Sequence, residues 1–328
     1  MSQEPPAAAE LQPGTVNTVL GPVPAENLGV IAAHDALLSV YPGAQYGYDV
    51  VINRADIFRT LKHKLERFRE AGGSTVVDST GMFHGRDVYL YESLQKATGV
   101  NIVASTGQGP EAMLGGYFLT PQTNPPTPWP AEKFAELFSA EVTEGMVVDR
   151  IERRHGAGLI TTTGTREGLT PTDQSLFQGA ARASVDTGAP VSFRFGKDPL
   201  SELETMLTQG VDASRVLVAG LDRADADTVR RVADAGAYVG LDTIGADKGA
   251  RDDAAVALIR ALIDAGHRER IIIASSSTAY AVAHETNEVA LTYLLEVFVP
   301  KLRDAGLSEE DITALTSTNP ASWLSGKA

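Results

Sequence analysis

Residues 215–242 read RVLVAGLDRADADTVRRVADAGAYVGLD. An apolar, β-branched run opens this stretch, a second one closes it, and a longer charged segment separates the two. The same alternation recurs along the chain, and it is typical of a parallel sheet whose strands are joined by crossover helices. Eight such runs can be identified, at residues 28–33, 74–78, 101–105, 158–162, 190–195, 215–219, 237–242 and 270–274.

Most of these runs are continuously apolar, as expected for strands that are buried on both faces. Between them, residues 55–71 and 251–265 place apolar side chains on one face at helical spacing. Eight βα units in a chain of 328 residues predict an α/β fold, a single (β/α)8 TIM barrel over residues 15–328. Residues 1–14, rich in Pro and Ala, are expected to form a flexible tail.

A doubly wound sheet is the alternative arrangement of the same elements. It receives no support from a nucleotide-binding motif, because no G-x-G-x-x-G follows the first run and no Walker A motif is present. One connection is unusually long: residues 108–130, QGPEAMLGGYFLTPQTNPPTPWP, are dense in Gly and Pro. In a barrel this loop lies at the C-terminal face, where it forms either a lid or pocket wall, or a tolerated insertion.

Composition restricts the class of partner. The formal net charge of −14 disfavours nucleic acid and anionic membrane surfaces, so we expect a small-molecule ligand. The absence of cysteine excludes disulfides, zinc–thiolate sites and a thiol nucleophile, and it fits a cytoplasmic location. The N-terminus lacks the basic and apolar regions of a signal peptide, and no stretch reaches the roughly 20 apolar residues of a membrane span.

Several motifs then occur in a fixed order along the chain. They are TVNTVLGPVPAENLGVIAAHD (15–35), VVDSTGMFHGRDV (76–88), NIVASTG (101–107), LTP with AARASVDTGAPV (169–191), YVGLDTIG (238–245) and TSTNPASWLS (316–325). Together they resemble the phosphotriesterase family of the amidohydrolase superfamily. The resemblance implies a (β/α)8 barrel, a hydrolase, a homodimer, and two divalent metals at the mouth of the barrel.

In that family the metals are held by two His after strand one, a carboxylated Lys on strand four, a His on each of strands five and six, and an Asp on strand eight. Carried over, the first His corresponds to His34. The other five positions fall on residues that are poor or impossible ligands: Ala36, Thr161, Arg194, Gly220 and, within one residue, Ser276. A guanidinium about 4 Å from a divalent ion costs on the order of 8 kcal/mol at an effective dielectric near 20. We therefore predict a divergent member with no binuclear metal centre and no cofactor.

Arg194 is the most informative of these positions. A half-buried guanidinium needs a partner, and Asp78, Asp222 and Asp242 are the internal candidates. A ligand carboxylate, phosphate or carbonyl is the other candidate, since arginine pairs well with such groups. His34 is a candidate general base. Together, His34, Arg194 and Asp242 are the predicted catalytic residues.

Further side chains are expected to line a ligand site at the same end of the barrel. Ser276 lies in a run of three serines that lacks a G-x-S-x-G context, so a nucleophilic role is disfavoured. Asp35 adjoins His34, but neighbouring residues of a strand point to opposite faces, so adjacency alone does not make them a dyad. The predicted ligand-binding residues are Asp78, His84, Thr161, Asp222, Ser276 and Tyr280.

Three functions follow from this reading. The first is a metal-independent hydrolase of a lactone or a related ester, with Arg194 polarising the carbonyl and His34 or an Asp activating water. The alternative is a non-catalytic homologue that binds a small anionic ligand or a partner subunit. A zinc-dependent ester hydrolase is the third, and it holds only if the positions matched above are wrong.

Overall fold

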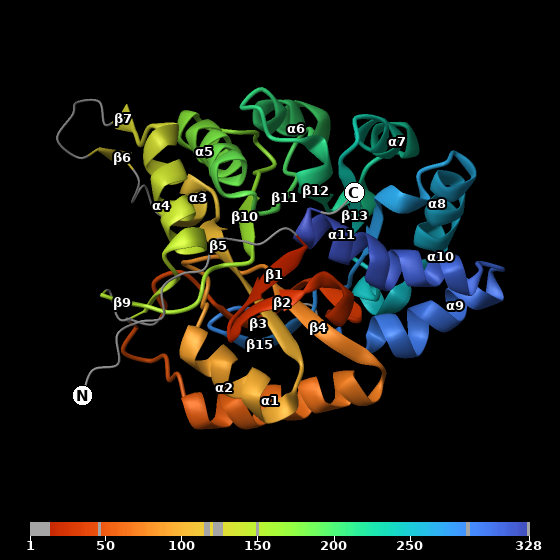
Figure 1. Cartoon of the computed structure of the whole chain (residues 1–328), viewed down its shortest axis with the longest axis horizontal. Coiled ribbons are helices and arrows are strands. Elements are labelled where there is room, and N and C mark those ends of the chain that lie inside the picture. The colour runs from red at the N-terminus through yellow and green to blue at the C-terminus, as the bar shows by residue number, and fades with distance from the viewer. Residues whose placement is uncertain are drawn as a thin grey trace.

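The computed structural model describes residues 14–44, 47–114, 119–120, 127–148, 151–286 and 289–326. Its centre is a sheet of parallel strands in the order β14-β13-β12-β11-β10-β5-β4-β3-β15, and this is the predicted (β/α)8 barrel (Figure 1). The strands are β3 (Val30–Val40), β4 (Gly73–Asp78), β5 (Asn101–Gln108), β10 (Leu159–Thr163), β11 (Val191–Arg194), β12 (Val216–Ala219), β13 (Tyr238–Leu241), β14 (Ile271–Ile273) and β15 (Thr278–Val282).

Each of the eight predicted runs overlaps one strand, but the closure of the ring differs from the expectation. The first strand continues to Val40 and pairs with β15, which was not predicted. β15 follows β14 after a short break, so the eighth strand of the barrel is built in two pieces. The break contains Ser276, whose φ of 44° lies in the left-handed region that non-glycine residues rarely occupy.

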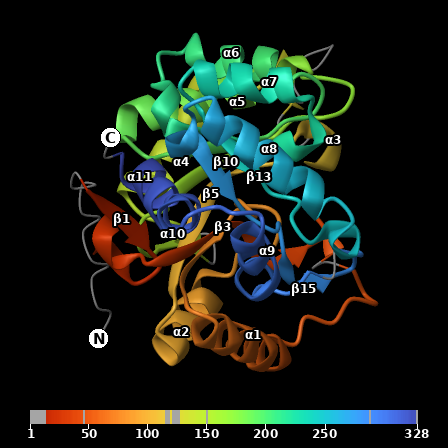
Figure 2. The ribbon, with the colours of Figure 1, turned by 90° about the vertical axis from the view of Figure 1, so that its right-hand side faces the viewer.

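Helices surround the barrel. In Figure 1 α4 to α8 follow one another around one side of it and α1 and α2 cover another, and Figure 2 shows α1 and α2 at the opposite end of the molecule from α6 and α7. The predicted helices at 55–71 and 251–265 are confirmed as α1 and α8. The bounds are α1 (Arg54–Glu70), α2 (Val88–Thr98), α3 (Glu111–Leu114), α4 (Ala131–Thr143), α5 (Pro171–Thr187), α6 (Pro199–Leu207), α7 (Ala226–Asp234), α8 (Asp252–Asp264), α9 (Val299–Asp304), α10 (Glu309–Thr313) and α11 (Asn319–Ser325).

Local sequence explains where these helices begin. The side chain of Asn53 accepts hydrogen bonds from the first N–H groups of α1, and Thr170 and Asp173 form a reciprocal capping box at the start of α5. In the described part of the chain, no helix is both long enough and apolar enough to cross a membrane.

The N-terminal end of the barrel is closed by an apolar plug. A hairpin of β1 (Thr15–Thr18) and β2 (Gly21–Pro24) lies against this end together with α11. Val16 and Trp323 are 1% and 0% exposed, and they belong to one buried cluster with Leu159, Tyr238 and Ile272 from the barrel strands. This end therefore contributes stability, and ligand chemistry is left to the other end.

The barrel interior becomes polar toward the C-terminal ends of its strands. Side chains on a strand alternate between its two faces, so every second residue points into the barrel. Tyr238 and Ile272 belong to the buried cluster at the N-terminal end. Four residues further along the chain, Asp242 and Ser276 fall on the same face. Two small hairpins interrupt the connections: β6 (Leu119–Thr120) with β7 (Thr127–Pro128) lies between β5 and α4, and β8 (Val147–Val148) with β9 (Glu152–Arg153) lies between α4 and β10. The long loop expected at 108–130 contains α3 and the first hairpin, but its residues 115–118 and 121–126, like the tail at 1–13, lie outside the described residues.

Candidate active site

One carboxylate oxygen organises the C-terminal mouth of the barrel. Oδ2 of Asp242 lies 3.0 Å from His34 Nδ1 and 2.5 Å from Arg194 Nη2, and it accepts a hydrogen bond of 2.9 Å from the Ser276 hydroxyl. Arg194 also donates to the Ser276 hydroxyl. His34 and Arg194, two of the predicted catalytic residues, thus both contact the third, Asp242, and all three contact Ser276.

The fold brings these residues together from four separate strands. Asp242 follows β13, Arg194 ends β11, and Ser276 lies in the break before β15. His34 reaches the same space because the pairing of β3 with β4 shifts register between Ala32 and Asp35. Such an irregularity redirects a side chain that strict alternation would point elsewhere.

Asp242 is held in its ionised form although only 1% of it is exposed. Burial alone would raise its pKa, but the charge of Arg194 and the hydrogen bonds from His34 and Ser276 outweigh it and depress the pKa well below the usual range. An ionised carboxylate can only accept hydrogen bonds, so Nδ1 of His34 carries its proton toward Asp242. In the neutral imidazole this tautomer leaves the lone pair on the other ring nitrogen, Nε2.

Asp35 lies beside this cluster without joining it. Its carboxylate accepts a 2.6 Å hydrogen bond from the backbone N–H of Ser277, so it does not form a dyad with His34. The pKa of Asp35 is raised to about 7, because burial and, to a lesser extent, the charges of Asp242 and Asp78 outweigh the lowering effect of the Ser277 N–H. Since Ser277 follows Ser276, this hydrogen bond anchors the segment in which Ser276 has its unusual backbone conformation.

Two of the predicted ligand-binding carboxylates accept hydrogen bonds from protein groups. Asp78 is fully buried and accepts from the Leu37 N–H at 2.7 Å and the Tyr91 hydroxyl at 3.0 Å. Asp222 accepts from the Thr243 N–H at 2.9 Å. Asp78 therefore supports the strands below the mouth, and Asp242 alone of the three predicted partners pairs with Arg194.

The remaining predicted residues lie around the mouth at different depths. The hydroxyl of Thr161 is 3.0 Å from that of its neighbour on β11, Ser192, and Tyr280 lies on β15. His84 follows β4, and burial together with the charge of His284 lowers its pKa. Within the described part of the chain, no hydrogen bond connects Thr161, His84 or Tyr280 to Asp242.

The residues that the resemblance places at the family's metal positions do not fit a binuclear metal centre. Arg194 points into the mouth and forms an ion pair with Asp242, so this carboxylate already has a cationic partner. The hydroxyl of Thr161 is hydrogen-bonded to that of Ser192. His34 directs Nδ1 to Asp242 and not to open space. Across the described ranges, no group of three or more His, Asp or Glu side chains is arranged to hold a metal ion.

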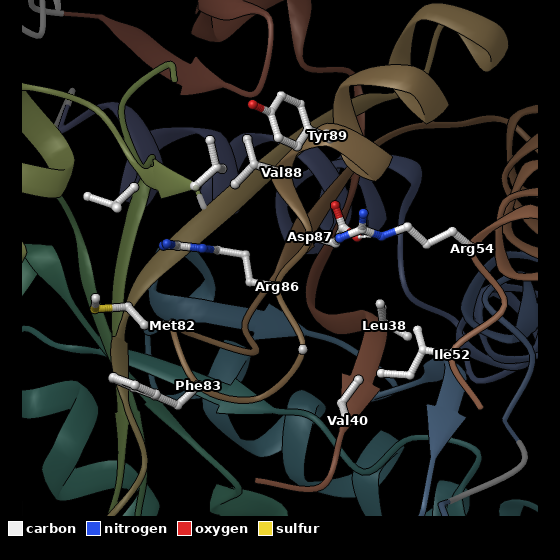
Figure 3. Close-up of a pocket in the computed structure, with 13 residues that line it drawn as sticks. Leu38, Val40, Ile52, Arg54, Met82, Phe83, Arg86, Asp87, Val88 and Tyr89 are labelled. Atoms are coloured by element: carbon white, nitrogen blue, oxygen red, sulfur yellow. Dashed lines mark ion pairs between the residues drawn. The ribbon is translucent and has the colours of Figure 1, made fainter. Parts of the chain in front are cut away.

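A separate hollow lies beside the mouth, between the ends of β3 and β4 and the start of α2 (Figure 3). Its volume is about 310 Å³. Its charged side chains are already paired, because Arg54 contacts Asp87 at 2.9 Å and Arg86 forms a bidentate, buried pair with Glu141. None of the predicted site residues lines this hollow, which is otherwise mainly apolar.

Two residues that the sequence analysis did not single out also shape the mouth, Ser277 through its bond to Asp35 and Arg223 after β12. In the sequence, Arg223 could have been found from Gly220, because the resemblance places a metal ligand at position 220 and Arg223 follows three residues later. A Cβ atom at Gly220 would approach Nη2 of Arg223 to 2.6 Å, so the glycine makes room for the guanidinium.

Comparisons with known proteins agree with this architecture. A phosphotriesterase homology protein of Escherichia coli (strain K12) is 29% identical over 300 residues, which cover 90% of this chain and 98% of that protein. An aryldialkylphosphatase of Saccharolobus solfataricus is 25% identical, with 92% and 97% covered. The structure of an organophosphorus hydrolase from Deinococcus radiodurans superposes with a TM-score of 0.81 at 22% identity, covering 99% of this chain and all of that one, and shares the fold.

The model of the phosphotriesterase family matches residues 14–324, which include every barrel strand, the hairpin and most of α11. With this match over nearly the whole chain and the barrel on which it lies, the chain belongs to the phosphotriesterase family.

Proposed function

We propose that this protein is a metal-independent hydrolase of small esters or lactones, and that His34 and Arg194 carry out the chemistry. The observation that carries the proposal is the contact of His34 Nδ1 with the ionised carboxylate of Asp242 at 3.0 Å. This contact fixes the tautomer and the orientation of the imidazole, so that Nε2 is the available base. Such a base contributes typically about 10² to 10⁴-fold to a rate.

Arg194 supplies the complementary electrostatic role. Nη2 is engaged by Asp242 and Ser276, and, within the described part of the chain, no protein acceptor contacts its Nε or Nη1. Because 29% of the side chain is exposed, these N–H groups are available to a substrate carbonyl. A hydrogen-bond donor to the developing oxyanion typically increases the catalytic rate by about 10² to 10³-fold.

The proposed reaction is a direct attack of water. Nε2 of His34 removes a proton from water as the water oxygen bonds to the carbonyl carbon, and the carbonyl oxygen becomes an oxyanion beside Arg194. The intermediate collapses with cleavage of the bond to the alcohol oxygen, which takes the proton from Nε2. A free carboxylic acid and an alcohol result, or a hydroxy acid when the substrate is a lactone.

Ser276 is not the nucleophile in this scheme. Its hydroxyl lies on the Nδ1 side of His34, at 3.3 Å, and donates to Asp242. A serine nucleophile must instead contact the nitrogen that accepts its proton. We assign Ser276 to positioning, because it bridges Asp242 and Arg194.

The test compares His34→Asn with the parent protein on a panel of aryl acetates and γ- and δ-lactones. Asparagine keeps a donor near Nδ1 but lacks Nε2, so we expect a rate loss of about 10² or more with the melting temperature largely retained. His63→Asn, at an exposed position on α1, is the matched control and should retain full activity. Equal activity of His34→Asn and the parent would refute the role of His34.

The second part of the proposal, that the reaction needs no metal, is tested by measuring metal content. Inductively coupled plasma mass spectrometry is applied to protein from cells grown with zinc and manganese. We expect activity that does not depend on bound metal. Activity that disappears on chelation and returns with zinc would establish the zinc-dependent alternative. A folded protein that hydrolyses nothing in the panel would favour the non-catalytic, ligand-binding alternative.

A further inference from the structure

Arg223 is held rigidly at the barrel mouth by its own surroundings. It ends a short 3-10 helix, Leu221–Arg223, that follows β12. Its Nε donates to the Gly220 carbonyl at 3.2 Å, its Nη2 donates to the Phe195 carbonyl at 3.0 Å, and its guanidinium lies 4.7 Å from the centroid of the Phe195 ring. An exposed arginine with three such contacts has lost much of its rotational freedom, which lowers the entropic cost of binding a ligand.

Gly220 makes this placement possible. Its φ of 82° lies in the left-handed region, and a Cβ atom there would meet Arg223 Nη2 at 2.6 Å. The resemblance places the strand-five and strand-six metal positions of the family at Arg194 and Gly220. Arg223 follows Gly220 by three residues, and its Nη2 bonds to the carbonyl of Phe195, the residue next to Arg194.

The charges around these two groups do not cancel. Arg194 shares Asp242 with His34, and Arg223 has no carboxylate within ion-pair distance among the described residues. Partial burial of the guanidinium lowers the pKa of Arg223, the neighbouring charges of Arg194 and Arg166 lower it further, and those of Asp242 and Asp222 oppose them. Arg223 is thus a cation without an ion-pair partner among the described residues, in a chain whose net charge is −14.

Free donors remain on both groups. Nη1 of Arg223, and Nε and Nη1 of Arg194, have no protein acceptor within the described ranges. Planar guanidinium groups with adjacent free N–H groups match the two oxygens of a carboxylate or the oxygens of a phosphate.

We propose that Arg194 and Arg223 together form a binding site for an oxyanion group, a carboxylate or a phosphate, and that the substrate carries this group beside the bond that is hydrolysed. The statement about the substrate rests on the hydrolase function proposed above, whereas the statement about the oxyanion site does not. The positive charge that two metals supply in the family is supplied here by two arginines, and it serves recognition of the substrate.

Binding is measured first, by isothermal titration calorimetry at low ionic strength, with inorganic phosphate and with monomethyl glutarate as probes. We expect saturable binding of at least one probe, and a loss of about tenfold or more in Arg223→Gln. Arg230→Gln, which removes the same charge from an exposed position on α7, should bind as the parent does. Preference for one probe identifies the anion as carboxylate or phosphate.

A second variant tests the geometry while keeping the charge. Gly220→Ala retains Arg223 but places a methyl group where the guanidinium lies, so we expect it to weaken binding as well, and circular dichroism confirms that the variant is folded. Failure of both probes to bind the parent, or equal binding by Arg223→Gln, overturns the oxyanion site.

Turnover then separates this inference from the proposed function. With monomethyl and dimethyl glutarate as substrates, we expect the parent to favour the charged ester in kcat/KM, and Arg223→Gln to lose about tenfold or more of this preference. Anion binding that depends on Arg223 without turnover of any ester leaves the site standing and refutes the hydrolase. Turnover with no preference for the charged ester refutes the substrate class.

Discussion

The buried carboxyl of Asp35 makes the stability of this protein depend on pH in an unusual direction. Its pKa is raised to about 7 in the folded state from an ordinary value of 3.8. Between these two values the folded state binds more protons than the unfolded state, so the free energy of unfolding falls as the pH rises. One pKa unit corresponds to about 1.4 kcal/mol, so the full effect is on the order of 4 kcal/mol.

Asp35→Asn isolates this contribution. The amide oxygen can still accept the hydrogen bond from Ser277 N–H, but the side chain no longer ionises. We expect the parent to lose stability relative to Asp35→Asn as the pH rises, with the loss complete above a pH of about 8. Since the sequence pI is about 4.9, measurements begin near pH 5.5, where about 2 kcal/mol of the difference is still accessible.

The assay is urea denaturation, followed by the fluorescence of the two tryptophans and by circular dichroism, at half-unit pH steps. Other raised carboxyl pKa values are present in both proteins, so the difference between them reports Asp35 alone when the sites are independent. A difference that does not change between pH 5.5 and 8.5 would show that Asp35 has an ordinary pKa and would refute the reasoning.

Two further perturbations test the packing of the barrel. Arg86→Met leaves the 1%-exposed Glu141 carboxylate without its partner, so we expect a loss of about 3–5 kcal/mol. The double variant Arg86→Met/Glu141→Leu should recover part of this loss, and a single variant as stable as the parent would contradict it. At Ser276, whose φ is 44°, glycine should be more stable than alanine by about 1 kcal/mol, as measured by urea denaturation. Equal stability would mean that the backbone there is not strained.

Much of the fold could be predicted from the sequence, because its signals are local. Eight apolar runs and the helical periodicity of residues 55–71 and 251–265 are properties of neighbouring residues, and they correspond to strands and helices in the structure. β15 could not be predicted in this way. It is a short strand whose existence depends on pairing with the end of β3, and that pairing forms only when the barrel closes.

For the candidate site, too, some features could be predicted from the sequence and others could not. From the sequence, the resemblance predicted that Arg194, Gly220 and Thr161 stand where the family holds metals, because such a match needs only the order of residues along the chain. Only the tertiary structure decided that Arg194 pairs with Asp242 and not with Asp78. These carboxylates follow different strands, and their depth below the mouth is set by strand register.

The tertiary structure also decided the geometry around His34. A register shift in β3 turns its ring toward Asp242, and the left-handed backbone of Ser276 brings a hydroxyl to the same carboxylate oxygen. Neither feature has a sequence signal of its own, because each results from the closure of the barrel between strands that lie far apart in the chain. The sequence determined which groups are available at the mouth, and long-range packing decided which of them meet.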